Sequence, residues 1–277
     1  GLYKTLMIPV TIKEFFPKGF VRRKYSQSEQ MFRQGKRDFL QEARVLSRFG
    51  DLDGITRIRS FFEENGTAYL VLDYLEGVSV RDYVAVNGRM TPAICWQILK
   101  NPMKALCRLH ENDMVHQDIS PDNIMVLPDG RIKLMDFGAA RDYTEFGEKS
   151  LSIVLKPGYA PPEQYQTHGI QGPWTDIYAL CATMYKCITG ETPPDAIDRV
   201  IDDHLKKISE FGITIPPQVE SVIIKGMSVS AKDRYQDIKD FCEDLYGGYE
   251  EIPASENEEI EIEQVLIKEN VENKVKK

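Results

Sequence analysis

Three polar side chains in residues 114–138 have types and spacing suited to chemistry. The segment reads MVHQDISPDNIMVLPDGRIKLMDFG, in which Asn123 follows Asp118 after five positions and Asp136 follows Asn123 after thirteen. A carboxylate placed on a loop, as we expect for Asp118, can accept a proton from a hydroxyl. An amide oxygen from Asn123 and a second carboxylate from Asp136 are hard oxygen ligands, which suit Mg²⁺.

A predicted hairpin brings the second and third of these side chains together. Pro128-Asp129-Gly130 is typical of a tight turn and separates two short strands, residues 124–127 and 131–135. Pairing these strands brings Asn123 and Asp136 to neighbouring strand ends. Two oxygen ligands leave room at a metal for water and phosphate oxygens. The sequence therefore indicates phosphoryl transfer, in which a nucleophile is positioned and the charge of the transferred group is neutralised.

The elements that must position these residues differ between the two parts of the chain. Residues 1–75 contain strand-like runs and one helical stretch, while the later part is mostly helical in pattern. This order predicts an α+β fold. The predicted strands cover residues 7–16, 55–62 and 68–74, and the last two are joined by a hairpin turn at 63–67. The predicted helices cover residues 29–49 and 94–109, with a further buried helix at 177–188.

With these residues in view, the chain resembles a eukaryotic-like serine/threonine protein kinase of the kind found in bacteria. His116-Gln117-Asp118 with Asn123 resembles the catalytic loop, and Asp136-Phe137-Gly138 resembles the metal-binding DFG motif. The resemblance covers about residues 3–247 and implies a bilobal fold. Residues 1–75 would form a kinase N-lobe with a truncated antiparallel sheet and one helix, and residues 76–250 a mainly helical C-lobe. Residues 251–277 would follow as an acidic tail or linker.

Further motifs of the family follow in the expected order near the N-terminus. Val10-Thr11-Ile12-Lys13 resembles the third-strand VAIK motif, with Thr11 in place of alanine. The resemblance implies that Lys13 holds the α- and β-phosphates of ATP and pairs with Glu42 on the predicted helix. Leu70–Gly77 resembles the hinge between the lobes. The implied ATP-binding residues are Lys13, Thr11, Leu72 as gatekeeper, the backbones of Asp73 and Leu75, Met125 beneath the adenine, and Asp136. The implied Mg²⁺ ligands are Asn123 and Asp136.

Motifs after the catalytic loop bear on the class of substrate. Residues 157–163 resemble the end of an activation segment, and Asp176 resembles the buried aspartate of the central C-lobe helix. Arg234 resembles the arginine that forms a structural pair with the glutamate of that segment, here Glu163. Small-molecule phosphotransferases share the catalytic core but lack this segment, so these motifs favour a protein substrate.

Besides Thr11, three features depart from the family pattern. Only twelve residues precede Lys13, and Gly1 is the only glycine among them, so the glycine-rich loop that cradles phosphates is lacking. Either the sequence begins after this loop or the protein lacks it, and real loss would weaken ATP binding. Gln117 replaces the arginine that grips an activation-loop phosphate, so we expect activation without phosphorylation of Ser150 or Ser152.

The third departure concerns the lysine that the family has two residues after the catalytic aspartate. Ser120 occupies the place of the lysine that reaches the γ-phosphate, while Lys156 stands near the place of a threonine that is close to that lysine. We hypothesise an exchange in which Lys156 supplies the missing positive charge at Asp118. The alternative is a surface lysine on a mobile loop.

Two readings from different classes remain open at the level of sequence. The first is a protein kinase that transfers the γ-phosphate of ATP to Ser or Thr hydroxyls, with Asp118, Lys13, Glu42, Asn123, Ser120 and Lys156 as the catalytic set. The second is a pseudokinase that acts as a binding or scaffold module. The complete set of Lys13, Glu42, Asp118, Asn123 and Asp136 favours the enzyme, and the missing loop favours the scaffold. A small-molecule kinase is a third reading within the enzyme class.

Composition bounds the remaining properties of the 277-residue chain. There are 35 Lys and Arg against 43 Asp and Glu, which gives a net charge of −8. An acidic surface repels phosphates and anionic lipid, so we expect no nucleic-acid partner and no membrane contact. Five cysteines without a CxxC pair indicate reduced thiols and a cytoplasmic protein. Residues 251–277 hold eight Glu and four Lys and predict a solvated linker, with an added edge strand at 259–263 as the alternative.

Overall fold

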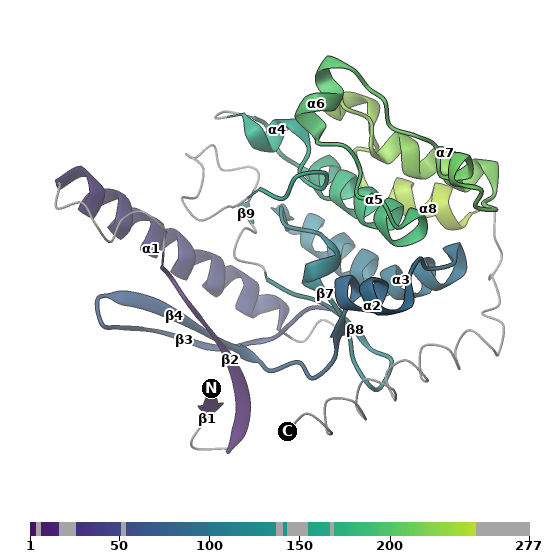
Figure 1. The fold of residues 1–277 in the computed structure, drawn as a ribbon. Helices are drawn as coiled ribbons and strands as arrows, with labels where there is room; N and C mark the ends of the chain where they lie inside the picture. The colour runs from purple at the N-terminus through teal and green to yellow at the C-terminus, as the bar shows by residue number, and fades with distance from the viewer. Residues whose placement is uncertain are drawn as a thin grey trace.

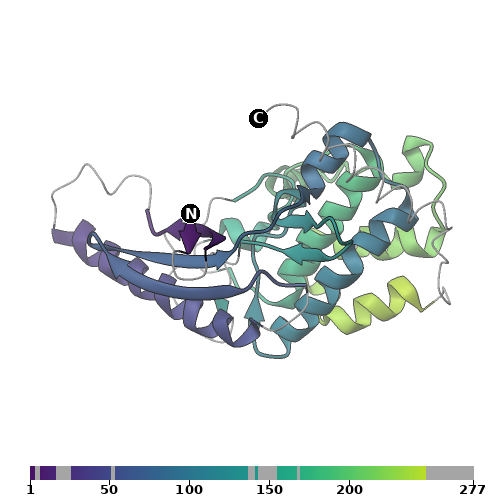
Figure 2. The ribbon, with the colours of Figure 1, turned by 90° about the horizontal axis from the view of Figure 1, so that it is seen from below.

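The structure is a computed structural model that describes residues 1–3, 7–16, 26–50, 54–136, 141–142, 155–166 and 169–247. Figures 1 and 2 show a sheet with one long helix at one end of the molecule and a group of helices at the other. The sheet is antiparallel with the strand order β1-β2-β4-β3. Its strands are β1 (Leu2–Tyr3), β2 (Ile8–Glu14), β3 (Ile58–Glu64) and β4 (Thr67–Asp73).

The predicted hairpin between the last two strands is confirmed. Strands β3 and β4 pair in antiparallel register from Glu64 opposite Thr67. Asn65 and Gly66 between them have φ angles of 51° and 79°. Two successive left-handed residues match the right-handed twist of the strands, which explains why Asn-Gly is favoured here.

Helix α1 (Ser26–Leu46) packs on β3 and β4 and closes one face of the sheet. It continues into a short 3₁₀ turn at Ser47–Phe49 and matches the helix predicted at residues 29–49. The ring of Phe15, just beyond β2, lies 5.3 Å from Phe32 and 5.5 Å from Phe39, measured between ring centroids. Phe32 and Phe39 recur at helical spacing, so both rings lie on the face of α1 that packs on the sheet and contact Phe15 there.

One strand begins later than its sequence pattern predicts. The apolar run at residues 55–62 was expected to be a strand, but β3 starts at Ile58. Ile55 instead forms an isolated bridge to Leu134, and both the N–H and the hydroxyl of Thr56 donate to the Leu134 carbonyl at 3.1 Å. This segment thus ties the sheet to the hairpin that carries Asp136, a long-range pairing that a local pattern does not reveal.

Helices dominate the rest of the described chain. Thr91 caps α3 through its hydroxyl, and Gly190 ends α5 with a left-handed φ of 78°. Both helices are largely buried, as predicted, and no described helix is long and apolar enough to span a bilayer. The helices are α2 (Val80–Asn87), α3 (Pro92–His110), α4 (Pro162–Tyr165), α5 (Pro173–Thr189), α6 (Ala196–Ile201), α7 (Pro217–Gly226) and α8 (Ile238–Tyr246).

Short strands at the junction of the two parts flank Asp118, Asn123 and Asp136 in the sequence and position them. Strands β5 (Val78–Ser79), β7 (Ile124–Val126) and β8 (Ile132–Leu134) form one small sheet, and β6 (Met114–Val115) pairs with β9 (Arg141–Asp142). In the β7–β8 hairpin, Ile124 lies opposite Leu134, and the Met135 N–H donates to the Asn123 carbonyl at 2.7 Å. The hairpin prediction is confirmed.

Candidate active site

Asp118 lies on the loop after β6, and Asn123 holds it in place. The Asn123 side-chain Nδ2 donates to the Asp118 carbonyl at 2.7 Å and to its Oδ2 at 2.8 Å. Asn123 ends the 3₁₀ turn Pro121–Asn123 directly before β7, which fixes its backbone. Because both amide hydrogens point to Asp118, the Asn123 Oδ1 oxygen lies on the other side of the amide group.

An ion pair between Lys13 and Asp136 joins the N-terminal sheet to the β7–β8 hairpin. Their side chains are 35% and 46% exposed, so both groups face solvent in part. Asp136 has a φ of 58°, a left-handed conformation that is uncommon outside glycine and often marks a functional site. The expected partner of Lys13, Glu42, belongs to α1, but its side chain lies outside the described part of the structure. The Lys13–Glu42 pairing therefore stays a prediction.

Lys156 reaches the same carboxylate from a distant segment. Its Nζ lies 3.0 Å from the Asp118 Oδ1 and donates to the Ser120 Oγ at 2.8 Å. The Lys156 side chain is 30% exposed, and Ser120 is fully buried. Both oxygens of Asp118 are thus engaged, one by an amide and one by an ammonium group.

Asp176 on α5 fixes the backbone before Asp118. It is fully buried, and its carboxylate accepts the N–H groups of His116 at 2.7 Å and Gln117 at 2.8 Å. His110 Nε2 lies 2.9 Å from the same carboxylate. A buried carboxylate requires such hydrogen bonds, because its desolvation is costly. The sequence-based expectation of a buried aspartate here is confirmed.

The buried His116 connects Asp118 to the chain before Asp136. Its Nε2 lies 3.0 Å from the Met135 carbonyl, and its Nδ1 accepts the Asp118 N–H at 3.3 Å. A ring nitrogen that accepts cannot carry a proton, so the geometry requires neutral His116. Burial lowers the pKa of His116, which also favours the neutral form. The nearby charges of Asp176 and Asp118 act to raise this pKa, but burial is the larger effect.

Gln117 occupies a constrained position beside this network. Its φ is 66°, and its carbonyl accepts a hydrogen bond from the Gln164 side chain at 2.8 Å. The Gln117 side-chain oxygen is buried without a hydrogen-bond partner. Ser150 and Ser152, whose modification we expect to be unnecessary, lie outside the described residues.

The predicted Glu163–Arg234 pair is present and buried. The Arg234 guanidinium donates to both Glu163 oxygens, at 2.7 and 3.1 Å, in bidentate geometry. Thr175 donates its hydroxyl to Glu163 at 3.0 Å, and the Arg234 guanidinium carbon lies 4.8 Å from the Tyr178 ring centroid. The pair anchors α4, and the segment before it, to the helical core.

The residues expected around adenine lie at the junction of the sheet and the β5–β7–β8 hairpin region. Thr11 on β2 pairs with Leu72 on β4, and Leu72 packs against the core. Asp73 donates its N–H to the Arg57 carbonyl at 3.0 Å, and its carboxylate pairs with Arg59. Leu75 follows β4, and Met125 is the central residue of β7. Their contacts with a nucleotide stay predictions.

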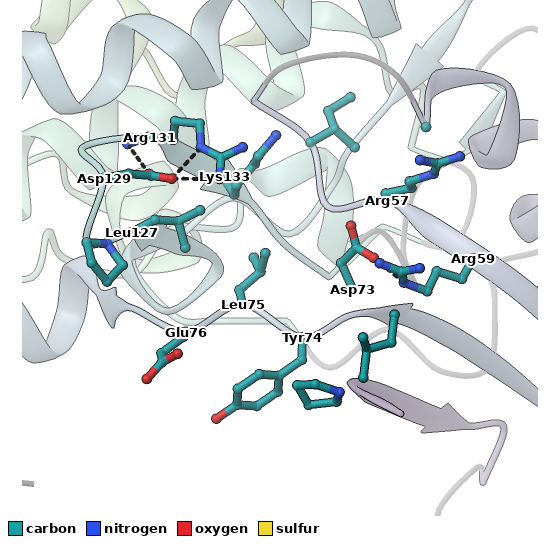
Figure 3. Close-up of a pocket in the computed structure, with 15 residues that line it drawn as sticks. Arg57, Arg59, Asp73, Tyr74, Leu75, Glu76, Leu127, Asp129, Arg131 and Lys133 are labelled. Atoms are coloured by element: carbon teal, nitrogen blue, oxygen red, sulfur yellow. Dashed lines mark hydrogen bonds and ion pairs between the residues drawn. The ribbon is translucent and has the colours of Figure 1, made fainter. Parts of the chain in front are cut away.

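A cavity of about 600 Å³ lies next to this junction (Figure 3). Figure 3 shows Arg57, Arg59 and Asp73 on one side of it and Asp129 and Lys133 on the other. Asp73 and Leu75 line it, whereas Lys13, Asp118, Asn123 and Asp136 do not. The cavity is therefore separate from the cluster of polar groups described above.

Several residues that support the site were not singled out from the sequence. Gln164 directly follows the motif at residues 157–163, Thr175 precedes Asp176, and His110 is the last residue of the amphipathic helix α3. Each makes a buried hydrogen bond to the loop or to its supports. No spacing rule marks such residues, because their partners are distant in sequence. Phe137 and Gly138 of the DFG motif, and the tail at 251–277, lie outside the described residues.

Comparisons with known proteins agree with this geometry. The serine/threonine-protein kinase PrkC of Bacillus subtilis is 29% identical over 216 residues, which cover 76% of this chain and 33% of that protein. The serine/threonine-protein kinase PknB of Mycobacterium tuberculosis is 29% identical over 189 residues, with 64% of this chain and 30% of that protein covered. The chain thus spans about a third of the length of these relatives.

A solved structure and a family match define the fold. The structure described as PpkA-294 apo form superposes with a TM-score of 0.73 at 31% identity, covering 88% of this chain and 89% of that one. The fold is therefore the α+β, bilobal fold of protein kinases, as predicted. The protein kinase domain matches residues 17–246, a range that contains Asp118, Asn123 and Asp136 and begins just after Lys13. The chain belongs to the protein kinase domain family.

Proposed function

We propose that this chain transfers the γ-phosphate of ATP to Ser and Thr hydroxyl groups of proteins. The observation that carries the proposal is the convergence of two ion pairs, Lys13–Asp136 and Lys156–Asp118, with Asn123 between the two carboxylates in sequence. A scaffold without catalysis has no need to hold this set together. The serine/threonine kinases among its relatives support the choice of acceptor.

Asp118 orients the hydroxyl that receives the phosphate and accepts its proton. Asn123 fixes the Asp118 Oδ2, and the side chain is 22% exposed, so the Oδ1 that Lys156 contacts can also face a substrate hydroxyl. Hydrogen bonds from the backbone N–H groups of His116 and Gln117 to the Asp176 carboxylate limit the movement of the loop. Such positioning is the main contribution a protein makes to phosphoryl transfer.

The residues present fit Mg²⁺-ATP. Asn123 Oδ1 and the Asp136 carboxylate supply hard oxygen ligands, and the described residues contain no group of three His, Cys, Asp or Glu that could hold a metal alone. A metal here would need oxygens from phosphate and water to complete its shell. When bound, Mg²⁺-ATP supplies the transferable phosphoryl group and offsets its charge. Lys13 binds phosphate oxygens in this proposal, and Glu42 orients Lys13.

The proposed nucleotide site extends from the phosphate-binding groups to the segment after β4. Thr11, Leu72 and Met125 enclose the adenine ring, and the backbones of Asp73 and Leu75 bind its edge. Residues 1–75 and 76–250 act as the two lobes around this site, with residues 251–277 as a linker.

A protein is the proposed acceptor because the segment at residues 155–166 is built as a rigid platform. The Glu163–Arg234 pair holds it to the core, and Gln164 ties it to the loop that carries Asp118. This platform lies beside Asp118 through the Lys156 contact. An extended peptide resting on it would present a hydroxyl to Asp118.

A transfer assay tests the proposal. The chain is incubated with radiolabelled ATP, Mg²⁺ and a panel of protein acceptors, and labelled amino acids are identified after hydrolysis. We expect labelled phosphoserine or phosphothreonine, and at least a 100-fold lower rate for Asp118→Ala, since general-base positioning contributes roughly 10²–10⁴-fold. The matched control is Asp240→Ala, which removes an exposed carboxylate on α8. Equal rates for the wild type and Asp118→Ala would refute the proposal and favour a pseudokinase.

A further inference from the structure

Lys156 and Ser120 together form a contact that places a cation beside Asp118. The Lys156 Nζ bridges the Asp118 Oδ1 at 3.0 Å and the Ser120 Oγ at 2.8 Å. Ser120 is uncharged, fully buried and two residues after Asp118 on the same loop. The loop itself therefore contributes a hydroxyl at this point, and the positive charge comes from a segment 36 residues later.

The backbone that carries Lys156 is held by a tight turn. The Lys156 carbonyl accepts the N–H groups of Tyr159 at 3.1 Å and Ala160 at 3.0 Å. Gly158 in this turn has a φ of 83°, and a Cβ there would lie 2.6 Å from the Pro193 carbonyl oxygen. Only glycine meets both conditions, so the turn is pressed against the chain after α5.

The same segment is fixed on its C-terminal side. Glu163 forms the buried pair with Arg234, and the Gln164 side chain donates to the Gln117 carbonyl at 2.8 Å. These contacts use no phosphate group, and they hold the segment against the loop that carries Asp118. The position of Lys156 thus depends on the docking of residues 155–166.

We propose that Lys156 is a catalytic residue that contacts the γ-phosphate during transfer and is delivered to the site by the substrate-binding segment. This inference rests on the proposed function and assigns the charge to a place other than the loop of Asp118. A lysine suits the task because its long, flexible side chain can move its amino group between Asp118 and a phosphate while its backbone stays fixed. The cation is in place only when the segment is docked, so segment docking completes the site without phosphorylation.

A reciprocal exchange of the two side chains tests the inference. We expect Lys156→Thr to lower kcat about 100-fold with less than a threefold change in KM for the protein substrate, because a cation at the transferred phosphate stabilises charge there and does not contact the protein substrate. The double variant Ser120→Lys/Lys156→Thr places the cation on the loop, and its kcat should be at least tenfold higher than that of Lys156→Thr. Lys232→Thr, at an exposed site, is the matched control.

Two results of the kinetic experiment would overturn the inference. One is a Lys156→Thr variant that keeps more than half of the wild-type kcat. The other is a double variant no faster than Lys156→Thr, although its melting temperature equals that of the wild type. If Lys156 only stabilised the fold, a lysine at position 120 would not compensate for its loss. Recovery of kcat in the double variant therefore distinguishes a role at the phosphate from a structural role.

Nucleotide binding provides a readout that does not need transfer. A cation that contacts the γ-phosphate favours ATP over ADP, so the ratio of their affinities, measured by titration calorimetry with Mg²⁺, should fall about tenfold in Lys156→Thr. An unchanged ratio, or a wild type that binds neither nucleotide, would overturn the inference. A wild type that transfers no phosphate but shows the expected fall would refute the proposed function and keep the Lys156 contact.

Discussion

The buried pair between Glu163 and Arg234 gives the sharpest prediction for stability. The Arg234 side chain is fully buried, and the Glu163 side chain is 8% exposed. Arg234→Met keeps most of the volume but removes both hydrogen bonds to Glu163, at 2.7 and 3.1 Å. It also removes donors from the carbonyls of Ser228 and Val229, which accept at 2.7 and 2.9 Å.

The expected cost follows from what remains after the substitution. Glu163 keeps one hydrogen bond, from Thr175 at 3.0 Å, and would be a buried charge without its counter-ion. Removing one partner of a buried pair costs about 3–5 kcal/mol, and the orphaned carbonyls place this case at about 4 kcal/mol or more. A domain of ordinary stability has about 5–15 kcal/mol, so the variant should fold but be markedly weakened.

Urea unfolding followed by tryptophan fluorescence measures this loss. Both tryptophans, Trp96 and Trp174, lie in the helical part of the molecule, so their signal reports on the region that the pair stabilises. The control Lys232→Met, at an exposed position near Arg234, should change the free energy of unfolding by less than about 0.5 kcal/mol.

A double-mutant cycle separates the pair from effects of volume. Glu163→Met and Arg234→Met each leave an unpaired buried charge, whereas the double variant leaves none. The double variant should therefore cost less than the sum of the single variants by about 1–3 kcal/mol. A loss below about 1 kcal/mol in Arg234→Met, together with a coupling energy near zero, would refute the reasoning.

Three further predictions concern the loop and its supports. Asp176→Asn should destabilise the protein by about 1–3 kcal/mol and lower transfer activity, because an amide cannot accept all three hydrogen bonds that the carboxylate accepts; a calorimetric melt and an activity assay check this. Gly158→Ala should lower kcat at least tenfold through displacement of Lys156, with activity near the wild-type value as the contrary result. Burial lowers the pKa of His116, so as the pH falls below about 6.5 this histidine is protonated in the unfolded state before it is protonated in the folded state. The free energy of unfolding should therefore fall by up to about 1.4 kcal/mol per pH unit below this pH. Urea titrations at several pH values measure this slope, which should be flatter for His116→Gln.

The parts that sequence predicted are those with local causes. The β7–β8 hairpin follows from a Pro-Asp-Gly turn between two apolar runs, and its register then fixes Asn123 beside the chain that leads to Asp136. Helix α1 and the β3–β4 hairpin follow from apolar spacing and from Asn65-Gly66 in the same way. Each depends on neighbours within about twenty residues.

The parts that sequence did not predict depend on distant contacts. Residues 55–57 have strand character, yet Ile55 and Thr56 bind Leu134 from the hairpin instead of joining β3. The pairing of Lys13 with Asp136 joins residues 123 positions apart, and no local pattern selects it over a pairing with Glu42. The hydrogen bonds to Asp176 likewise follow from how α5 packs beneath the loop. For Lys156, resemblance indicated the neighbourhood, and the structure supplied the two contacts.

The central claim is that Asp118 and its neighbours form a phosphoryl-transfer site. The most direct measurement is the initial rate of phosphate transfer from saturating Mg²⁺-ATP to a protein acceptor by the chain and by Asp118→Asn, with melting temperatures of both. The site predicts transfer by the wild type, a rate at least 100-fold lower for Asp118→Asn, and melting temperatures that agree within about 2 °C. Equal rates, or no transfer by a folded wild type that binds Mg²⁺-ATP, would contradict it.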